Sequence, residues 1–307
     1  MDNKVILIGL GKMGKGLLTN FIKNGIEVIG YNRSKEEYLS IERNKNLYLA
    51  SSFDDIFTKT DKNIPVLVWL MLSQGNAVDE VITNIKPYLK KGDTIVDGGN
   101  SYYKDSIRRA GELNSSGVNY LDIGVSGGIN GATNGACMMI GGRKDIFDKY
   151  EHIFKSISLD NGYKYMGTSG CGHYTKMVHN AIEYGMMESI AEGLDLLRTG
   201  SKNSIGFEVS LKDALSVWNH GSIISSYLTE LAEDIFTGSS IEDIDEIEPI
   251  IEENGEGAWS LNEAITNKVP FYSLSVALFE RYSSKRVSFS RKVISLLRNK
   301  FGGHKTY

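Results

Sequence analysis

The chain has 307 residues, of which 41% are hydrophobic and 23% charged, with a formal net charge of −4. This is the composition of a folded protein with enough apolar material for one large or two medium cores, and at this length two domains are expected. It has no basic block or basic-aromatic strip, which argues against nucleic-acid binding. No apolar run approaches the roughly 20 residues of a membrane helix, and no basic leader precedes the first strand pattern. We therefore expect a soluble, cytoplasmic protein that binds neither nucleic acid nor a membrane.

The first half of the chain alternates short β-branched runs with amphipathic helical stretches. Six runs are predicted as strands: Val5–Ile8, Val28–Tyr31, Val66–Leu70, Thr94–Asp97, Tyr120–Ile123 and Met138–Ile140. Strands that alternate with helices predict a mostly parallel sheet covered by helices. We assign residues 1–172 to a doubly wound α/β domain of Rossmann type.

The pattern changes after the small-residue segment 168–172. Apolar residues at helical spacing predict one long helix over His173–Arg198. Helical patterns continue to about Arg298, with interruptions expected near 200–204, 238–240, 253–257 and 269–270. We assign residues 173–307 to an all-α domain for substrate binding and oligomerisation.

A glycine motif follows the first predicted strand and opens a helix. Residues 9–14 read Gly-Leu-Gly-Lys-Met-Gly, the GxGxxG pattern of a dinucleotide-binding turn. Such a turn needs glycine because the backbone is tight and must approach a pyrophosphate at the helix N-terminus. A glycine turn that merely packs a helix on a sheet is the alternative. The context favours a cofactor site formed by Gly9, Leu10, Gly11, Met13 and Gly14.

The end of the second predicted strand bears on the choice between NAD and NADP. An NAD site usually has an acid there, which accepts a hydrogen bond from the ribose 2′-hydroxyl. This chain has Asn32-Arg33-Ser34 instead, and a guanidinium can bind a 2′-phosphate and stack on adenine. We therefore favour NADP, with NAD as the alternative. A surface Arg33 paired with Glu36 or Glu37 would leave the choice open.

Two further glycine-rich segments are expected at the carboxyl edge of the sheet, where ligands bind in open α/β folds. Asn100 follows Gly98 and Gly99 after a strand, where it can bind a substrate hydroxyl or the nicotinamide; a capped turn is the alternative. The segment 124–135 is denser in glycine, so its backbone N–H groups can converge on a carboxylate, and Ser126 adds a hydroxyl. A glycine loop without a ligand is the alternative here.

The long predicted helix carries an unusual group of polar side chains. Lys176, His179, Asn180, Glu183 and Tyr184 share one face through i+3, i+4 and i+7 spacing. A lysine can act as a base on an alcohol when burial and neighbouring positive charge lower its pKa. A carboxyl group that desolvation keeps protonated can act as an acid. A solvated helix face is the alternative.

In these segments the chain closely resembles the 6-phosphogluconate dehydrogenases, the decarboxylating enzymes of the pentose phosphate route. The resemblance rests on residues 9–14, 32–34, 97–105, 124–142 and 172–185. Its most specific part is the pairing of Lys-Met-Val-His-Asn with Ile-Glu-Tyr-Gly within the last segment. It covers the first predicted domain and the start of the second.

The resemblance implies a reaction and the residues that perform it. 6-Phosphogluconate would be oxidised and decarboxylated to ribulose 5-phosphate, with Lys176 as the base and Glu183 as the acid. The implied substrate contacts are Asn100, Ser126, Gly127, Gly128, His179, Asn180 and Tyr184. The cofactor contacts would include Asn32, Arg33, Ser34, Met71, Leu72 and Asn100.

The C-terminal part of the chain also resembles this family. Arg281, in an Arg-x-x-Ser-Ser segment, is implied as a phosphate ligand. Arg298 and His304 match a tail that reaches the substrate of a neighbouring subunit, which implies a homodimer or homotetramer. A disordered charged terminus is the alternative.

The chain also departs from the usual family pattern. It resembles a short form with one helical set, whereas most members are about half again as long. Glu256 stands where the long form has a neutral phosphate-binding residue, so that contact is not carried over. Cys137 and Cys171 have no metal-ligand spacing, and neither a metal nor a disulfide is expected.

Two other functions compete with the decarboxylating dehydrogenase. A non-decarboxylating β-hydroxyacid dehydrogenase of the 3-hydroxyisobutyrate type would share the glycine loops and the lysine. It would have no reason to carry Glu183, Tyr184 and the C-terminal tail. A non-catalytic NADP-binding sensor would not need Lys176 and Glu183 together.

Overall fold

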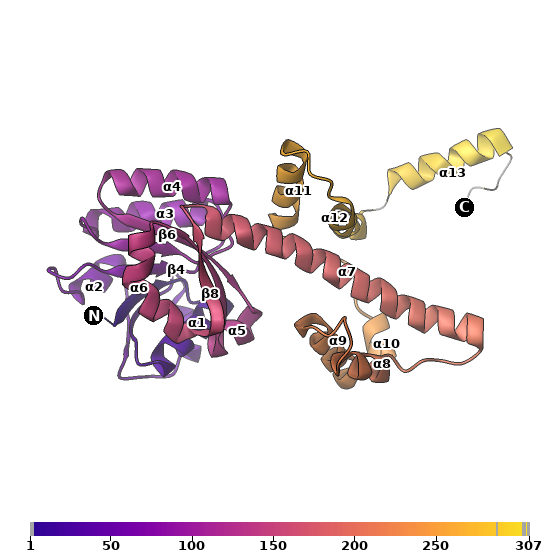
Figure 1. Ribbon diagram of the computed structural model, residues 1–307, viewed down its shortest axis with the longest axis horizontal. Helices are drawn as coiled ribbons and strands as arrows, with labels where there is room; N and C mark the ends of the chain where they lie inside the picture. Colours follow the sequence, from indigo (N-terminus) through magenta and orange to yellow (C-terminus); the bar gives the residue numbers. More distant parts are fainter. Residues whose placement is uncertain (1–2, 287, 303–304, 306–307) are drawn as a thin grey trace. The chain divides into compact units, whose positions relative to one another are not determined.

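The computed structural model describes residues 3–286, 288–302 and 305. The chain forms two compact units, Met1–His179 and Asn180–Tyr307 (Figure 1). The first unit is a sheet covered by helices on both faces, and the second is helical throughout its described residues. Both expected domain types, the Rossmann-type α/β domain and the all-α domain, are therefore confirmed.

The first unit contains a sheet with the strand order β3-β2-β1-β4-β5-β6-β7-β8. All neighbouring strands are parallel except β6 and β7, which run antiparallel. The strands are β1 (Lys4–Ile8), β2 (Glu27–Tyr31), β3 (Leu47–Leu49), β4 (Leu67–Leu70), β5 (Thr94–Asp97), β6 (Asn119–Ser126), β7 (Ala136–Gly142) and β8 (Ser158–Gly167). All six predicted strands are present, while β3 and β8 were not predicted.

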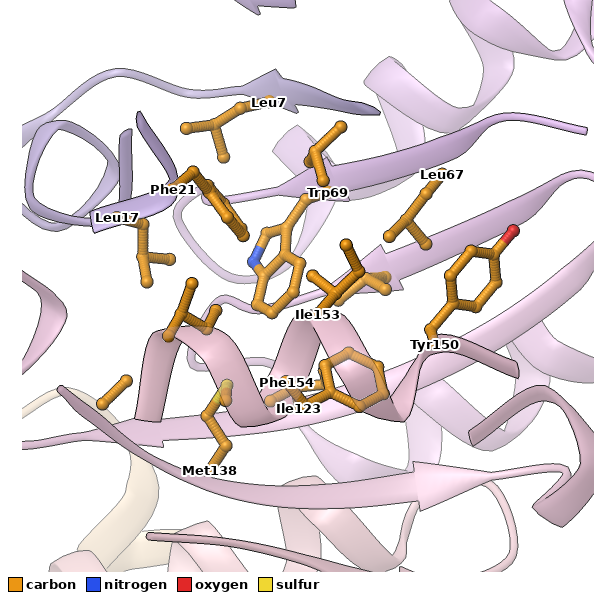
Figure 2. Packing of buried hydrophobic residues seen from close by; sticks show 14 of the residues in the cluster. Leu7, Leu17, Phe21, Leu67, Trp69, Ile123, Met138, Tyr150, Ile153 and Phe154 are labelled. Carbon is orange, nitrogen blue, oxygen red and sulfur yellow. The ribbon is translucent and has the colours of Figure 1, made fainter. Parts of the chain in front are cut away.

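Helices cover both faces of this sheet. They are α1 (Lys12–Lys23), α2 (Phe53–Thr58), α3 (Asn76–Ile85), α4 (Tyr103–Ser115), α5 (Gly128–Asn134) and α6 (Lys144–Ile157), with 3₁₀ helices at Lys35–Ser40 and Lys86–Tyr88. One core joins the sheet to α1 and α6, and Figure 2 shows Trp69 at its centre among Phe21, Ile153 and Phe154. A second core joins the opposite face to α2, α3 and α4.

The two faces of strand β6 carry different kinds of side chain. Leu121, Ile123 and Val125 belong to the first core, while Tyr120 belongs to the second. Because side chains alternate along a strand, Asp122, Gly124 and Ser126 lie on the same face as Tyr120. Asp122 and Gly124 on this face lie against the start of the long helix that begins at Cys171.

Helix α7 (Cys171–Ile205) begins in the first unit and ends in the second. The interruption expected near residues 200–204 was wrong, because α7 continues through this segment. A glycine inside a helix costs only about 1 kcal/mol relative to alanine, and Ser201 in the next position is buried. The helix ends before Gly206, whose φ of 77° lies in the left-handed region that ends many helices.

The remaining helices belong to the second unit. They are α8 (Leu211–Asn219), α9 (Tyr227–Gly238), α10 (Ile241–Asp245), α11 (Glu256–Thr266), α12 (Tyr272–Ser284) and α13 (Phe289–Gly302). Small cores join α7 to α8 and α9, and α7 to α11 and α12. In the part of the chain that the structure describes, no helix is long and apolar enough to cross a membrane.

Candidate active site

The glycine turn between β1 and α1 combines tight packing with one open position. A Cβ on Gly9, whose φ is 101°, would lie 2.2 Å from the Met71 carbonyl oxygen, and one on Gly14 would lie 1.9 Å from the Gly9 oxygen. A Cβ on Gly11 would meet no heavy atom within 4 Å among the described residues. The first turn of α1 has no acidic residue and no side-chain cap, so its N–H groups and positive end fit a pyrophosphate.

The carboxyl ends of β4 and β5 lie beside this turn. A Cβ on Gly98 would lie 2.8 Å from Met71 Sδ, and one on Gly99 would lie 2.5 Å from the Leu72 carbonyl oxygen. Asn100 comes next and is exposed. The structure thus brings Met71, Leu72 and Asn100 to the same sheet edge as the glycine turn.

The residues expected to determine the preference for NADP or NAD follow the end of β2. The Asn32 side chain accepts a hydrogen bond from the Leu10 N–H at 2.9 Å, which joins this segment to the glycine turn. Arg33 is exposed and makes no hydrogen bond or ion pair with another described residue. Glu36 accepts a hydrogen bond from Ser34, and Glu37 pairs with Lys15. The alternative that Arg33 pairs with either glutamate is therefore wrong.

Lys35 was not anticipated as part of this region. Its ammonium lies 4.1 Å from the centre of the Tyr31 ring and 4.9 Å from that of Tyr38. It also donates to the Asn32 carbonyl oxygen at 2.8 Å. The segment after β2 is thereby held in a defined conformation beside Arg33.

Helix α7 packs against β6 at Lys176, the lysine predicted to act as the base. A Cβ on Gly124 would lie 2.2 Å from the Cβ of Lys176, so only glycine leaves room for the lysine. Lys176 is 6% exposed, and Ser126 Oγ lies 3.2 Å from His179 Nε2. The solvated-face alternative is wrong for this part of α7, and the structure brings Ser126, His179 and Lys176 to one place.

Asp122 holds the start of α7 and was not identified from the sequence. Its buried carboxylate accepts hydrogen bonds from the backbone N–H groups of Gly170 at 2.7 Å and His173 at 2.9 Å. The available signal was one acidic residue within the otherwise apolar strand run of residues 120–125. A carboxylate buried in such a run needs hydrogen-bond donors.

A second buried network, also missed, supports the segment that carries Asn100. The Asp97 carboxylate accepts hydrogen bonds from Ser101 and Tyr120, each at 2.8 Å, and from Arg109 at 3.2 Å. Arg109 also binds Asp79 through two nitrogen atoms. Burial opposes the positive charge, but the hydrogen bonds to Asp79 and the charge of Asp97 outweigh it and raise the pKa of Arg109.

The second unit contains a Tyr–Arg pair. The Arg281 guanidinium lies 3.6 Å from the centre of the Tyr184 ring and donates to the Glu252 carbonyl oxygen at 2.7 Å. The Tyr184 hydroxyl accepts a hydrogen bond from the Asn254 N–H at 3.4 Å, and burial raises the pKa of this tyrosine. The buried carboxylate of Glu256, at the start of α11, acts in the same direction.

The other expected site residues are placed as follows. Asn180 is buried on α7, while Glu183 is half-buried two turns beyond Lys176 on the same helix. Gly127 and Gly128 have φ of 102° and 61° where β6 turns into α5, a conformation that favours glycine. Arg298 is exposed on α13 and forms no ion pair with another described residue. His304 lies outside the described residues.

The described residues contain no group of three or more His, Cys, Asp or Glu placed to hold a metal ion. Donors of another kind are present: the N–H groups at the start of α1, the Arg33 guanidinium and the Arg281 guanidinium. All three suit anionic groups such as phosphates. The first unit therefore offers two features that suit a phosphate, the start of α1 and Arg33, and the second unit offers one, Arg281.

Comparison with known proteins identifies the family of both units. Residues 4–167 match the model described as the NAD binding domain of 6-phosphogluconate dehydrogenase. Residues 172–304 match the model of the 6-phosphogluconate dehydrogenase C-terminal domain. Between them the two models span nearly the whole chain.

Individual relatives agree with the family models. The chain is 38% identical over 306 residues to YqeC of Bacillus subtilis, with 99% of each chain covered. It is 35% identical to the NAD(+)-dependent, decarboxylating 6-phosphogluconate dehydrogenase of Haloferax volcanii, covering 97% of this chain and 96% of that one. A solved 6-phosphogluconate dehydrogenase of Plasmodium falciparum, studied with NADP+ and with 6-phosphogluconate, superposes with a TM-score of 0.80 at 30% identity. That match covers 97% of this chain and 65% of the Plasmodium chain.

A more distant structural match shows the fold alone. The 3-hydroxyisobutyrate dehydrogenase of Mycobacterium tuberculosis superposes with a TM-score of 0.66 at 17% identity.

Proposed function

The chain belongs to the 6-phosphogluconate dehydrogenase family, whose members are NAD(P)-dependent and decarboxylating, and we propose that Lys176 is the base of its reaction. The reaction oxidises 6-phosphogluconate and releases carbon dioxide, as in the pentose phosphate route. We retain the assignment of residues 1–172 to the cofactor domain and 173–307 to the substrate and oligomerisation domain.

The observation that carries the proposal is the burial of Lys176 beside the Ser126–His179 contact. A lysine ammonium is almost never buried without a functional or charge partner. Here the first carbons of the lysine side chain are packed on Gly124, where an added Cβ would lie 2.2 Å from Lys176 Cβ. The neighbouring hydroxyl and imidazole provide donors and acceptors for a polyhydroxy acid.

The proton transfers follow from these side chains. The Lys176 Nζ atom takes the proton of the substrate 3-hydroxyl, while the bound nicotinamide supplies the hydride acceptor. Protonated Lys176 then donates a hydrogen bond to the new C3 carbonyl oxygen. That carbonyl accepts the electron pair released when the C1–C2 bond breaks and carbon dioxide leaves. Glu183 protonates the carbon of the resulting enediolate, which gives ribulose 5-phosphate.

The cofactor would be held at the carboxyl edge of the sheet. The open position at Gly11 and the uncapped start of α1 fit its pyrophosphate, and Leu10, Met13, Met71, Leu72 and Asn100 would line the rest of the site. Arg33, which forms no ion pair with another described residue, would bind the 2′-phosphate of NADP. We therefore propose NADP as the preferred cofactor, with Asn32 and Ser34 beside the phosphate.

The substrate would be held through its carboxylate at one end and its phosphate at the other. Ser126, Gly127 and Gly128 would bind the carboxylate through a hydroxyl and backbone N–H groups, and His179 and Asn180 would bind hydroxyl groups. Tyr184 and Arg281 would bind the phosphate, because charge-assisted hydrogen bonds to a guanidinium are strong.

We further propose that the enzyme is a homodimer or homotetramer, in which Arg298 and His304 complete the site of a neighbouring subunit. The second unit exposes large apolar side chains at helical spacing. On α9 these are Tyr227, Leu231 and Ile235, which are 48%, 40% and 53% exposed. A contiguous apolar helix face of this kind is typical of an interface. Size-exclusion chromatography with light scattering would test this, and a monomer in the active fraction would contradict it.

The reaction is tested by initial rates with 6-phosphogluconate, read at the reduced-nicotinamide absorbance band while carbon dioxide is trapped. We expect matched reduction and carbon dioxide release, a higher kcat/KM with NADP than with NAD, and no turnover of 3-hydroxyisobutyrate. Lys176→Ala should bind NADP normally and lose turnover by more than about 10³-fold, because it removes the proton acceptor. Substantial residual activity would remove Lys176 from this role.

A further inference from the structure

The start of α7 cannot cap itself. The residue before the helix is Gly170, which has no side chain and a φ of 94°. The first N–H groups of any helix lack partners within the helix, and a serine, threonine or aspartate usually accepts from one of them. Here that acceptor must come from elsewhere in the fold.

Asp122 on β6 provides the missing cap. Its two carboxylate oxygens accept hydrogen bonds from the N–H groups of Gly170 and His173, one oxygen for each donor. A Cβ on Gly141 would lie 2.7 and 2.8 Å from these two oxygens, and one on Gly172 would lie 2.2 Å from the Asp122 carbonyl oxygen. The carboxylate is therefore enclosed and held close to the positive end of the helix.

The same face of β6 determines where the lysine lies. Asp122, Gly124 and Ser126 are alternate residues of the strand, and they meet His173, Lys176 and His179 respectively. Alternate residues of a strand are about 7 Å apart. The N–H of His173 and the Cβ of Lys176 thus lie against alternate residues of one strand.

A second element supports the helix start. The His173 ring is buried, and its Nδ1 lies 2.7 Å from Ser106 Oγ on α4. The first turn of α7 is therefore held by Asp122 on β6 and by Ser106 on α4. The next turn carries Lys176.

We propose that Asp122 is a positioning residue for Lys176: its buried carboxylate caps α7 from β6 and sets the place of the lysine backbone. This inference rests on the proposed role of Lys176 as the base. Asp122 itself is assigned no contact with substrate or cofactor. Its removal should therefore reduce the rate of the chemical step while leaving binding largely intact.

The test is Asp122→Asn, which keeps the shape of the side chain but replaces one acceptor oxygen with a donor. We expect kcat to fall about 100-fold, since a displacement of about 1 Å can have such an effect. The KM for 6-phosphogluconate and the Kd for NADP should stay within about threefold of the wild-type values. A kcat within threefold of wild type would overturn the proposal.

Leu113→Ala is the matched control, because Leu113 is a buried residue of α4 in the second core and has no polar role. It should lower the unfolding temperature yet leave kcat unchanged when assayed well below that temperature. If Asp122→Asn loses kcat and NADP affinity together, its effect is general destabilisation and the proposal fails.

Two further variants complete the experiment. If Asp122→Asn does not fold, Ser106→Ala tests the other support of the helix start. It should lower kcat about threefold to tenfold at an unchanged KM, and an unchanged kcat would overturn the inference. Lys176→Ala separates the two proposals. If it remains active, the proposed base is wrong; if it is inactive while Asp122→Asn keeps its rate, only the positioning role is wrong.

Discussion

Gly124→Ala is the smallest change that should disable the enzyme without removing a functional group. The new methyl group would point at Lys176, with its carbon 2.2 Å from the lysine Cβ and 2.9 Å from Cγ. Ordinary van der Waals contact begins at 3.4 Å, so the helix or the strand would have to move by about 1.2 Å. The third neighbour, at 3.1 Å, is the Gly172 carbonyl oxygen, which belongs to the backbone and cannot rotate away.

The expected size of the effect follows from that displacement. A misplacement of about 1 Å at a catalytic group costs about 100-fold in rate, which corresponds to about 2.7 kcal/mol in the activation free energy. Cofactor binding should change little, because the glycine turn lies at the ends of other strands. We therefore expect a loss in kcat with a nearly unchanged Kd for NADP.

The assay is the initial rate with saturating 6-phosphogluconate and NADP, with the Kd for NADP measured separately by fluorescence titration. Gly111→Ala on α4 is the matched control, because a Cβ there would meet no heavy atom of the described residues within 4 Å beyond its own stretch of helix. It should keep full activity and gain about 0.5–1 kcal/mol of stability, as expected for a helix-interior glycine. A folded Gly124→Ala enzyme with kcat within about threefold of wild type would refute the reasoning.

Three other changes probe the cofactor turn, the phosphate ligand and a buried tyrosine. Gly11→Ala should leave the unfolding temperature unchanged, because a Cβ there meets no heavy atom of the described residues within 4 Å. It should raise the Kd for NADP about tenfold or more; unchanged affinity would place the pyrophosphate elsewhere. Arg281→Ala should raise the KM for 6-phosphogluconate about 10- to 100-fold, the value of a charge-assisted hydrogen bond of about 1.5–3 kcal/mol. The Kd for NADP should not change, and an unaffected KM would remove Arg281 from the phosphate site. Burial and the neighbouring charge of Asp97 raise the pKa of Tyr120 well above its ordinary value, so the folded state keeps a proton that the unfolded state loses above about pH 10. The stability contribution of this tyrosine is therefore complete below about pH 10 and falls above it by up to about 1.36 kcal/mol per pH unit. Urea unfolding at pH 9 and pH 11 should show this additional decrease in the wild type and not in Tyr120→Phe; equal decreases would contradict it.

Local sequence patterns were sufficient for the parts of the fold that depend on neighbouring residues. The alternation of apolar runs and amphipathic helices predicted the parallel sheet, and the GxGxxG motif of residues 9–14 does follow β1 directly and include the first residues of α1. Local sequence patterns did not predict the elements whose local signals are weak. Strand β3 has three residues, and β8 is largely half-exposed or exposed with a left-handed residue at Asn161. Gly200 was taken for a helix end, although the helix continues past it.

The sequence by itself determined which side chains share a face of α7, because residues three, four and seven positions apart on a helix are neighbours whatever surrounds it. Only the tertiary structure decided what that face lies against. Ser126 and His179 are 53 positions apart, and Asp122 and Gly170 are 48 apart. Their contacts exist because β6 places its alternate residues under the start of α7. The periodicity within either segment does not predict these contacts, because they depend on how a strand and a helix from distant parts of the chain pack together.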